Sequence, residues 1–337
     1  MLVLGLESTC DETACAIVRD GQEVLSNVIA SQINLHAEYG GVVPELACRR
    51  HVDVMIPVID EALKQANATL NEIDLIAVAH GPGLVGALLL GLNASKALSL
   101  ALGKPFIGVN HVEAHLYAAI MSQSKPISFP CIGVVLSGGH TALIRMDGIG
   151  QYIPLAQTID DAIGEAFDKV AKILDLPYPG GPVVEKLALE GNSKRFLFKA
   201  GRVKGQPLDF SFSGIKTAVL YAVRALPILT TSDKCDVAAS FQEAVFTDIV
   251  KKTMLAAREY GCSTLIFGGG VTNNQRLRGM FAEVSDGFTL LWPSAGLSLD
   301  NAAMIAGLGY HQFVRRGVGD DMGLEAFTRD QTFSSKH

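Results

Sequence analysis

Two stretches of this chain share one order of predicted elements: an apolar strand, a polar turn, and a second strand that closes at Asp-Gly. These elements are Leu2–Glu7, Ser8–Thr13 and Ala14–Val18 in the first stretch, and Cys131–Leu136, Ser137–Thr141 and Ala142–Met146 in the second. The closing Asp20 and Asp147 lie 127 residues apart. The repetition predicts a duplicated α/β architecture with a cleft between two lobes. Chance similarity between two hairpins is the alternative that the pattern leaves open.

Length and charge narrow the possibilities further. A chain of 337 residues, 49% hydrophobic and only 18% charged, is long enough for two compact domains with substantial cores. Its net charge of −6 gives no overall attraction to nucleic acid, so any contact with RNA needs a local basic patch. The stretch Gly191–Gln206 offers one, with Lys194, Arg195, Lys199, Arg202 and Lys204 and no acidic residue. This stretch could contact phosphate groups, most readily those of RNA, or it could be an ordinary loop exposed to solvent.

The cysteines and the N-terminus indicate the cellular compartment. The six cysteines are scattered without a Cys-x2-Cys pair, which argues against a zinc ribbon or a disulfide framework and fits a reducing compartment. No basic region precedes the first apolar run, so we expect no signal peptide. The best membrane-spanning candidate, Leu84–Leu102, is interrupted by Asn93 and Lys96 and contains glycine. We interpret it as a tightly packed, nearly buried helix and expect a cytoplasmic protein without membrane association.

His111 and His115 are the first candidates for chemistry. They fall in a helix expected over Val112–Met121, directly after a strand expected over Pro105–Val109. Residues four apart lie on one helix face, where two imidazoles can bind one metal ion. The passage from a strand end to a helix start is where α/β proteins place their sites. Two unrelated helical histidines are the alternative.

Zinc endopeptidases use the same histidine spacing, but they place Glu directly after the first His as the general base. In this chain Val112 occupies that position. Glu113 lies about 200° round the helix from His111, so it is expected to point away from the metal face. The endopeptidase interpretation is therefore weakened, whereas the metal site is unaffected.

Three further segments attract attention. A helix expected over Asp160–Leu174 carries an acidic face, formed by Asp161, Glu165 and Asp168, whereas Lys169 and Lys172 lie elsewhere on the helix. Such a face could bind a hydroxyl group or a metal ion, or it could simply be exposed to solvent. A strand, the glycines Gly268–Gly270 and a helix over Gln275–Glu283 predict a phosphate or nucleotide cradle, although no P-loop or dinucleotide fingerprint occurs. Asp300 precedes the last helix, as either its N-cap or a third metal ligand.

Taken together, the motifs resemble the TsaD family, the universal tRNA N6-threonylcarbamoyladenosine transferases. The similarity covers residue 1 to about 325, and its motifs are long and in the family's order. The matching segments are Glu7–Thr13 (ESTCDET), His36–Leu46 (HAEYGGVVPEL), the His111/His115 pair, Leu136–Thr141 (LSGGHT), Asp160–Lys169 (DDAIGEAFDK), Tyr178–Pro182 (YPGGP), Asp209–Thr217 (DFSFSGIKT), Gly269–Asn274 and Asp300-Asn301.

The resemblance implies a two-lobed α/β fold of the actin–Hsp70–sugar-kinase (ASKHA) type, with duplicated mixed-sheet domains and a central cleft. We expect one lobe from residues 1–110 plus about 301–337 and the other from 111–300. The implied reaction transfers threonylcarbamoyl from threonylcarbamoyl-AMP to N6 of adenosine 37 in tRNAs that read ANN codons. Family members work with a small paralogous partner (TsaB type) and an ATPase partner (TsaE type).

The resemblance also implies roles for single residues. The metal ligands would be His111, His115 and Asp300, holding one divalent ion, iron or zinc. The turn against the nucleotide or carbamoyl group would be Val135, Leu136, Ser137, Gly138 and Gly139. Ribose and base would contact Asp168, Gly181 and Glu185, with Asn274 beside the adenosine. Asp11 and Glu12 match acids important for activity, while Ser8-Thr9 reverses the order found in many members.

The chemistry suggests how such a site would work. An exocyclic amine attacks a carbonyl whose leaving group, AMP, is already good, so positioning and oxyanion stabilisation matter most. Backbone N–H groups of Ser137–Gly139 could stabilise the oxyanion, and Asp11 is our candidate general base. Two other classes stay open: an ATPase or kinase of the same fold, which leaves the histidines unexplained, and a metalloendopeptidase.

Overall fold

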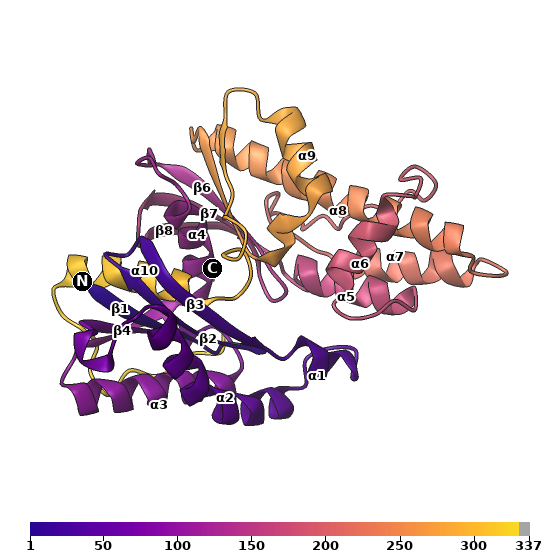
Figure 1. Cartoon of the computed structure of the whole chain (residues 1–337). Coiled ribbons are helices and arrows are strands. Elements are labelled where there is room, and N and C mark those ends of the chain that lie inside the picture. Colours follow the sequence, from indigo (N-terminus) through magenta and orange to yellow (C-terminus); the bar gives the residue numbers. More distant parts are fainter. Residues whose placement is uncertain (330–337) are drawn as a thin grey trace.

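The structure is a computed structural model that describes residues 1–329. Figure 1 shows two lobes, each built on one five-stranded sheet. The strand order is β3-β2-β1-β4-β5 in the first sheet and β8-β7-β6-β9-β10 in the second, so the order along the chain is the same in both. In each sheet the first three strands are antiparallel and the other pairings are parallel. The predicted α/β fold with duplicated mixed sheets is therefore confirmed.

The predicted strand–turn–strand units are the hairpins β1–β2 and β6–β7, which occupy matching places in the two sheets. The strands of the first sheet are β1 (Leu2–Glu7), β2 (Glu12–Arg19), β3 (Glu23–Ser31), β4 (Leu75–Gly81) and β5 (Phe106–Asn110). Those of the second sheet are β6 (Cys131–Leu136), β7 (Thr141–Gly148), β8 (Gln151–Gln157), β9 (Thr264–Gly268) and β10 (Thr289–Leu291).

Helices cover both faces of the first sheet because successive strand side chains point to opposite faces. Leu4 and Leu6 pack in the cluster with α2, whereas Val3 packs with α10 on the other face. The helices around this sheet are α1 (Ile33–Ala37), α2 (Pro44–Gln65), the 3₁₀ turn η1 (Leu70–Glu72), α3 (Val85–Leu102) and α10 (Ala302–Arg316).

The second sheet packs one face against a large helical layer. Leu136 from β6 and Phe167 and Phe241 from the helices belong to the same buried cluster. The elements of this lobe are α5 (Ile163–Ile173), α6 (Gly180–Ala188), α7 (Ser213–Arg224), α8 (Thr231–Glu259), the 3₁₀ turn η2 (Gly270–Asn273) and α9 (Gln275–Val284). They form the upper and right parts of Figure 1.

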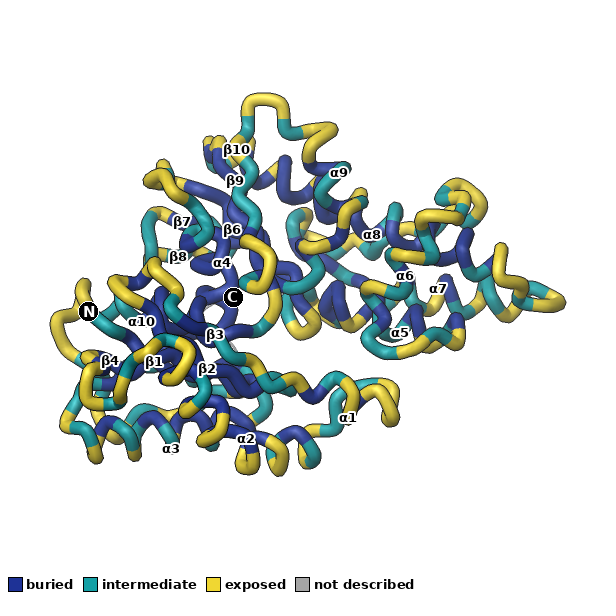
Figure 2. The backbone as a smooth tube through the Cα atoms, in the orientation of Figure 1, coloured by how far each residue is buried: buried dark blue, intermediate teal, exposed yellow. Residues whose placement is uncertain are grey.

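Helix α4 (His111–Met121) lies between the two sheets and is buried along almost its whole length (Figure 2). Its Ala114 and Ala118 pack with the first sheet and α10, and its Val112 packs with β6 and β7 of the second. The sequence prediction placed this helix correctly. Because it contacts both sheets, its first two turns are held firmly between them, and these turns carry the two histidines. The expected division into 1–110 plus 301–337 and 111–300 stays a prediction, and residues 330–337 lie outside the described residues.

The expectation of a nearly buried helix at Leu84–Leu102 was wrong. Helix α3 covers the first sheet with one face only, and it exposes Val85 (56%), Leu89 (44%) and Leu100 (70%). Periodicity could not show this, because apolar residues surround the whole helix. Of the described helices, α3 is long and apolar enough to cross a membrane by length and composition alone, a test that helices of soluble proteins also pass.

Candidate metal centre and the cleft above it

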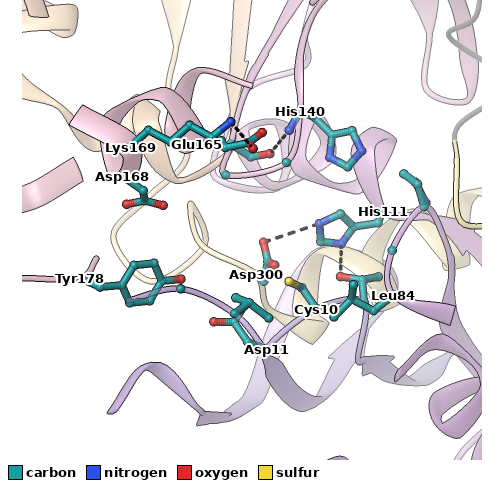
Figure 3. A pocket seen from close by; sticks show the side chains of 18 of the residues that line it. Cys10, Asp11, Leu84, His111, His140, Glu165, Asp168, Lys169, Tyr178 and Asp300 are labelled. Carbon is teal, nitrogen blue, oxygen red and sulfur yellow. Dashed lines mark hydrogen bonds and ion pairs between the residues drawn. The ribbon is translucent and has the colours of Figure 1, made fainter. Parts of the chain in front are cut away.

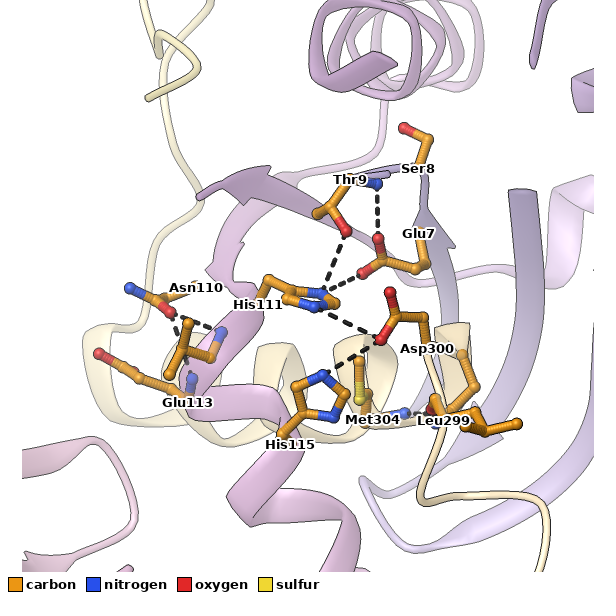
Figure 4. Close-up of polar contacts among 12 residues, drawn as sticks. Glu7, Ser8, Thr9, Asn110, His111, Glu113, His115, Leu299, Asp300 and Met304 are labelled. Atoms are coloured by element: carbon orange, nitrogen blue, oxygen red, sulfur yellow. Dashed lines mark hydrogen bonds and ion pairs between the residues drawn. The ribbon is translucent and has the colours of Figure 1, made fainter. Parts of the chain in front are cut away.

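The metal candidates come together at the start of α4. Asn110, the last residue of β5, caps this helix by accepting hydrogen bonds from Val112 N (2.8 Å) and Glu113 N (3.2 Å). The next two turns present the imidazoles of His111 and His115, with ring centroids 4.6 Å apart. Figure 4 shows both rings turned toward Asp300, while Glu113 points away from them. The structure thus supports the weakening of the endopeptidase interpretation.

Asp300 faces the histidines because another residue caps α10. The side chain of Asn301 accepts from Met304 N (3.1 Å), so the N-cap role that we left open for Asp300 belongs to Asn301. Asp300 Oδ1 lies 3.2 Å from His115 Nε2 and 3.6 Å from His111 Nε2. One donor atom from each of the three side chains lies within 4.8 Å of the others.

This donor set fits a divalent ion. Ligand atoms around a tetrahedral zinc ion lie about 3.3 Å apart, given bonds of about 2.0–2.1 Å. The two nitrogen–oxygen distances bracket that value. His115 is fully buried, and neither of its ring nitrogens makes a well-aligned hydrogen bond among the described residues, although Nε2 lies 3.2 Å from Asp300 Oδ1. A buried polar atom without a partner is costly unless something else binds it, and a metal ion would satisfy His115 Nε2.

Glu7, at the end of β1, orients His111. Its carboxylate is fully buried; Oε2 accepts from His111 Nδ1 (2.9 Å), and Oε1 accepts from Thr9 N (2.6 Å). Because a carboxylate only accepts, Nδ1 carries a proton, and Nε2 is the nitrogen that faces Asp300 and is left for a metal ion. Burial lowers the pKa of His111, but the charges of Glu7 and Asp300 outweigh it and raise that pKa to about 9. Sequence analysis missed this residue, although a charged side chain that ends an apolar strand was a usable signal.

Above the metal candidates lies a cavity of about 680 Å³ between the lobes (Figure 3). Loops from both halves of the chain contribute to it. Predicted site residues in its lining are Asp11, His111, Ser137, Gly138, Gly139, Asp168 and Asp300. Residues that we did not assign also line it, among them Cys10, His140, Lys172 and Tyr178. The first, second and fourth of these lie inside the quoted family motifs, but no feature of the sequence assigned a role to any of the four.

The glycine turn between β6 and β7 forms one rim of this cavity. Ser137 N donates to His140 O (2.9 Å) and His140 N donates to Ser137 Oγ (3.0 Å), so these groups close the turn itself. At Gly138 and Gly139 an added Cβ would meet open space. Burial, reinforced by the charges of His111 and His115, lowers the pKa of His140 to about 3, so its ring is neutral.

Val135 and Leu136 lie in β6 and not in the cavity wall of the described chain. Their side chains are fully buried on opposite faces of the second sheet, Val135 toward α4 and Leu136 toward the helical layer. Strand alternation explains this arrangement. Only their backbone can approach a ligand.

The acidic pair of the first hairpin divides between two environments. Asp11 lines the cavity, and burial together with the charge of Asp300 raises its pKa. Glu12 instead accepts from Ser31 Oγ (2.7 Å), outside the cavity wall of the described residues. Burial and the neighbouring Asp11 raise the pKa of Glu12 to about 8. Of the two carboxyl groups, Asp11 is therefore the one that lines the cavity.

The prediction of an acidic helix face at Asp160–Leu174 was wrong in one respect. Helix α5 begins only at Ile163, so Asp161 precedes it. Lys169 forms ion pairs with both Asp161 (2.6 Å) and Glu165 (2.8 Å), so these two acids are partly neutralised within the protein. Asp168 is separate: it accepts from Gly180 N (2.7 Å), and burial raises its pKa to about 6.

Three other predicted residues lie around the first turns of α6 and α9, outside the cavity wall of the described chain. Gly181, in the first turn of α6, has open space where a Cβ would stand. Glu185 accepts from Gln275 N (2.7 Å), the first residue of α9. Asn274 caps the same helix through Leu277 N (3.1 Å) and donates to Gln242 Oε1 (2.8 Å).

The expected phosphate cradle at Gly268–Gly270 has a different explanation. A Cβ on Gly268 would lie 2.5 Å from the carbonyl oxygen of His115, and one on Gly269 would lie 2.5 Å from that of Leu136. Gly269 also has φ +94, a conformation that favours glycine. These glycines let β9 approach α4 and β6 closely, and they do not line the cavity among the described residues.

The comparisons with known proteins agree with this architecture. The family model of tRNA N6-adenosine threonylcarbamoyltransferase (TsaD) matches residues 23–307. A relative of that name from Protochlamydia amoebophila is 66% identical, covering 100% of both chains. Another from Syntrophotalea carbinolica is 51% identical, covering 97% of this chain and 95% of its own.

Among solved structures, full-length HypF in its phosphate- and nucleotide-bound form is similar with a TM-score of 0.63. The sequences are 13% identical, and the match covers 95% of this chain and 56% of HypF, so it supports the two-lobed fold alone. The family model and the relatives identify the function. The chain belongs to the TsaD family of tRNA N6-adenosine threonylcarbamoyltransferases, and it is a transferase that modifies tRNA.

Proposed function

We propose that His111, His115 and Asp300 hold one divalent ion, iron or zinc, on the floor of the cleft where threonylcarbamoyl is transferred. The convergence of their donor atoms within 4.8 Å, directly beneath a cavity of about 680 Å³, carries this proposal. When bound, such an ion acts as a Lewis acid that polarises the reacting carbonyl or orients the phosphate of threonylcarbamoyl-AMP. The donor set suits iron and zinc about equally.

The residues around the ion position the reactants. The backbone N–H groups of Gly138 and Gly139 are assigned to the developing oxyanion, because the N–H groups of Ser137 and His140 are already used inside the turn. Val135 and Leu136 contribute through the strand that fixes this turn. Amine attack on the carbonyl expels AMP, which needs little help as a leaving group, so orientation is the main task.

Asp11 is assigned as the general base that takes the proton from the N6 amine. It lines the cavity, and burial raises its pKa, which makes it a stronger base than an ordinary carboxylate. Glu12 carries its own proton at neutral pH, because its pKa is about 8, and it supports the hairpin through Ser31. Its contribution to activity would be indirect.

The adenosine and the nucleotide need further contacts. Asp168 faces the cavity and is assigned to a ribose hydroxyl, from which its carboxylate can accept a hydrogen bond. Gly181, Glu185 and Asn274 are proposed to form the outer part of the same binding region, close to the first turns of α6 and α9. Because they lie outside the cavity wall, they are candidates to contact the part of the substrate that remains outside the cavity.

The expected partners and location fit the same proposal. A small paralogous protein of the TsaB type would cover the apolar residues that α2 and α3 leave exposed, which include Val52 (61%), Ile56 (69%), Val85 and Leu100. An ATPase of the TsaE type would complete the assembly. A cytoplasmic location follows from the tRNA substrate.

A mass-spectrometric assay for threonylcarbamoyladenosine tests the proposal. It combines unmodified tRNA, threonylcarbamoyl-AMP and the partner proteins with either wild type or His111→Ala/His115→Ala. We expect product from wild type and none from the double variant. Product from the double variant at the wild-type rate would remove the metal site from the reaction. Absence of product from wild type, with partners that are active on a homologue, would favour the ATPase alternative.

A further inference from the structure

One segment of this acidic protein carries a clear excess of positive over negative charge. Residues 191–232, here called the basic segment, contain a single acid, Asp209, which is buried and accepts from Gln157 N (3.0 Å). The lysines and arginines of the segment are Lys194, Arg195, Lys199, Arg202, Lys204, Lys216 and Arg224. Since the whole chain has a net charge of −6, the remainder is more strongly negative than the total suggests.

Two of these cations are neutralised within the protein. Arg195 forms ion pairs with Asp233 (2.5 Å) and Asp236 (2.7 Å), at the start of α8, and Lys216 lies 3.6 Å from Asp161. The other cations of the segment are exposed and have no ion pair among the described residues: Lys194, Lys199, Arg202, Lys204 and Arg224. Figure 2 shows that the connection from α6 to α7, where most of them lie, runs along the surface.

The connection is anchored and does not depend on its cations for its shape. Gly201 N donates to Ser211 O (3.0 Å), and Gln206 N donates to Val203 O (3.3 Å) across the turn that carries Lys204. The pairing of Arg195 fixes the beginning of the connection. Exposed cations on an anchored loop are preorganised for a polyanion.

A chain of contacts links this loop to the rim of the cleft. Ser211 Oγ donates to Asp160 Oδ2 (2.6 Å), which holds the loop beside the start of α5. The next residue, Asp161, binds Lys169 (2.6 Å), and Lys169 lines the cavity. The basic segment is therefore joined to the rim of the cleft through Ser211.

We infer that the basic segment docks the phosphate backbone of the tRNA whose adenosine enters the cleft, an inference that rests on the proposed site. The cavity admits a nucleoside-sized group, so the remainder of the RNA must lie across the surface outside it. Phosphate contacts of this kind are independent of sequence and set the register of the nucleic acid. On a surface that otherwise repels a polyanion, they also determine the direction of approach.

The test uses the full-length chain, assembled with its partner proteins, carrying Lys199→Gln, Arg202→Gln and Lys204→Gln. A matched control removes three cations elsewhere by Lys64→Gln, Lys125→Gln and Lys251→Gln. We expect the slope of log affinity for tRNA against log salt to fall by about 2–3 in the first variant, at about 0.7–0.9 per phosphate contact. Its KM for tRNA should rise about tenfold or more, with kcat and the KM for threonylcarbamoyl-AMP unchanged, and the control should differ little from wild type.

Two results would overturn the inference. One is an unchanged salt slope and an unchanged KM for tRNA, in a protein whose melting temperature equals that of wild type. The other is loss of a partner protein from the assembly with tRNA affinity retained, which would assign the segment to an acidic protein. Loss of turnover in wild type itself would count against the proposed site only, because tRNA binding is measured separately.

Discussion

Replacing Glu7 by glutamine should weaken metal binding, although the new side chain keeps nearly the same size and shape. In the wild type one carboxylate oxygen accepts from His111 Nδ1 (2.9 Å) and the other from Thr9 N (2.6 Å). A carboxamide has a single accepting oxygen, so it must turn its NH₂ group toward one of these two N–H donors. While His111 Nε2 is bound to a metal ion, Nδ1 stays protonated, so either orientation leaves a buried donor facing another donor.

The size of the effect follows from this geometry. A hydrogen bond to a charged group contributes about 1.5–3 kcal/mol, and Glu7 is fully buried, so water cannot replace the lost acceptor. The substitution also removes one of the two carboxylates, Glu7 and Asp300, that would balance a divalent ion beside neutral imidazoles. Loss of such an outer partner typically lowers metal affinity about 10- to 100-fold, which corresponds to about 1.4–2.7 kcal/mol.

The assay is a competition titration of metal-stripped protein against a chromophoric zinc chelator, together with the melting temperature of the metal-free protein. Glu113→Gln is the matched control, because Glu113 is also buried, lies in the same helical turn as His111 and points away from the imidazoles (Figure 4). The reasoning would be refuted if Glu7→Gln bound zinc within about threefold of wild type, well below the expected loss. An equal loss in Glu113→Gln would refute it as well, since the effect would then reflect any buried charge near α4.

Three further predictions concern the surroundings of this centre. Asp11→Asn should lower the single-turnover transfer rate about 100-fold or more, measured by rapid quench; an unchanged rate excludes Asp11 as the base. The pKa of Glu12 is raised from 4.5 to about 8, so the folded state keeps a proton that the unfolded chain releases, and stability falls as the pH rises through this window. In thermal unfolding, Glu12→Gln should therefore become more stable relative to wild type as the pH rises from about 5 to about 8. A difference in melting temperature that does not change with pH would contradict the raised pKa of Glu12. Gly268→Ala, whose Cβ would lie 2.5 Å from His115 O, should cost about 1–3 kcal/mol in denaturant unfolding, whereas Gly279→Ala, with open space around its Cβ, should not destabilise.

The fold was largely predictable because its signals are local. Alternating strands closed by Asp-Gly identified both hairpins, and the histidine helix was placed within one residue of its observed start. Exposure was less predictable. Helix α3 is apolar all round, so its sequence could not show that Val85 and Leu100 face outward.

Site residues could be predicted only where they belong to a recognisable sequence motif. The spacing of His111 and His115 indicated a metal pair, the place of Asp300 before the last helix left it as either an N-cap or a third ligand, and the family resemblance implied the ligand role. Glu7 escaped notice because its partner is 104 residues away along the chain. The ion pair of Lys169 with Asp161 was missed for a different reason: the helix begins later than expected, so the helical wheel placed Asp161 wrongly.

The arrangement of the helices positions both the floor of the cleft and its rim. Glu7, His111 and Asp300 come from the end of β1, the start of α4 and the approach to α10, and of these segments α4 contacts both sheets. The rim likewise combines loops of both lobes, such as Asp11 from the first and Gly139 from the second. Because α4 also packs against β6 and β9 of the second sheet, the position of the two histidines depends on both lobes, as the rim of the cavity does.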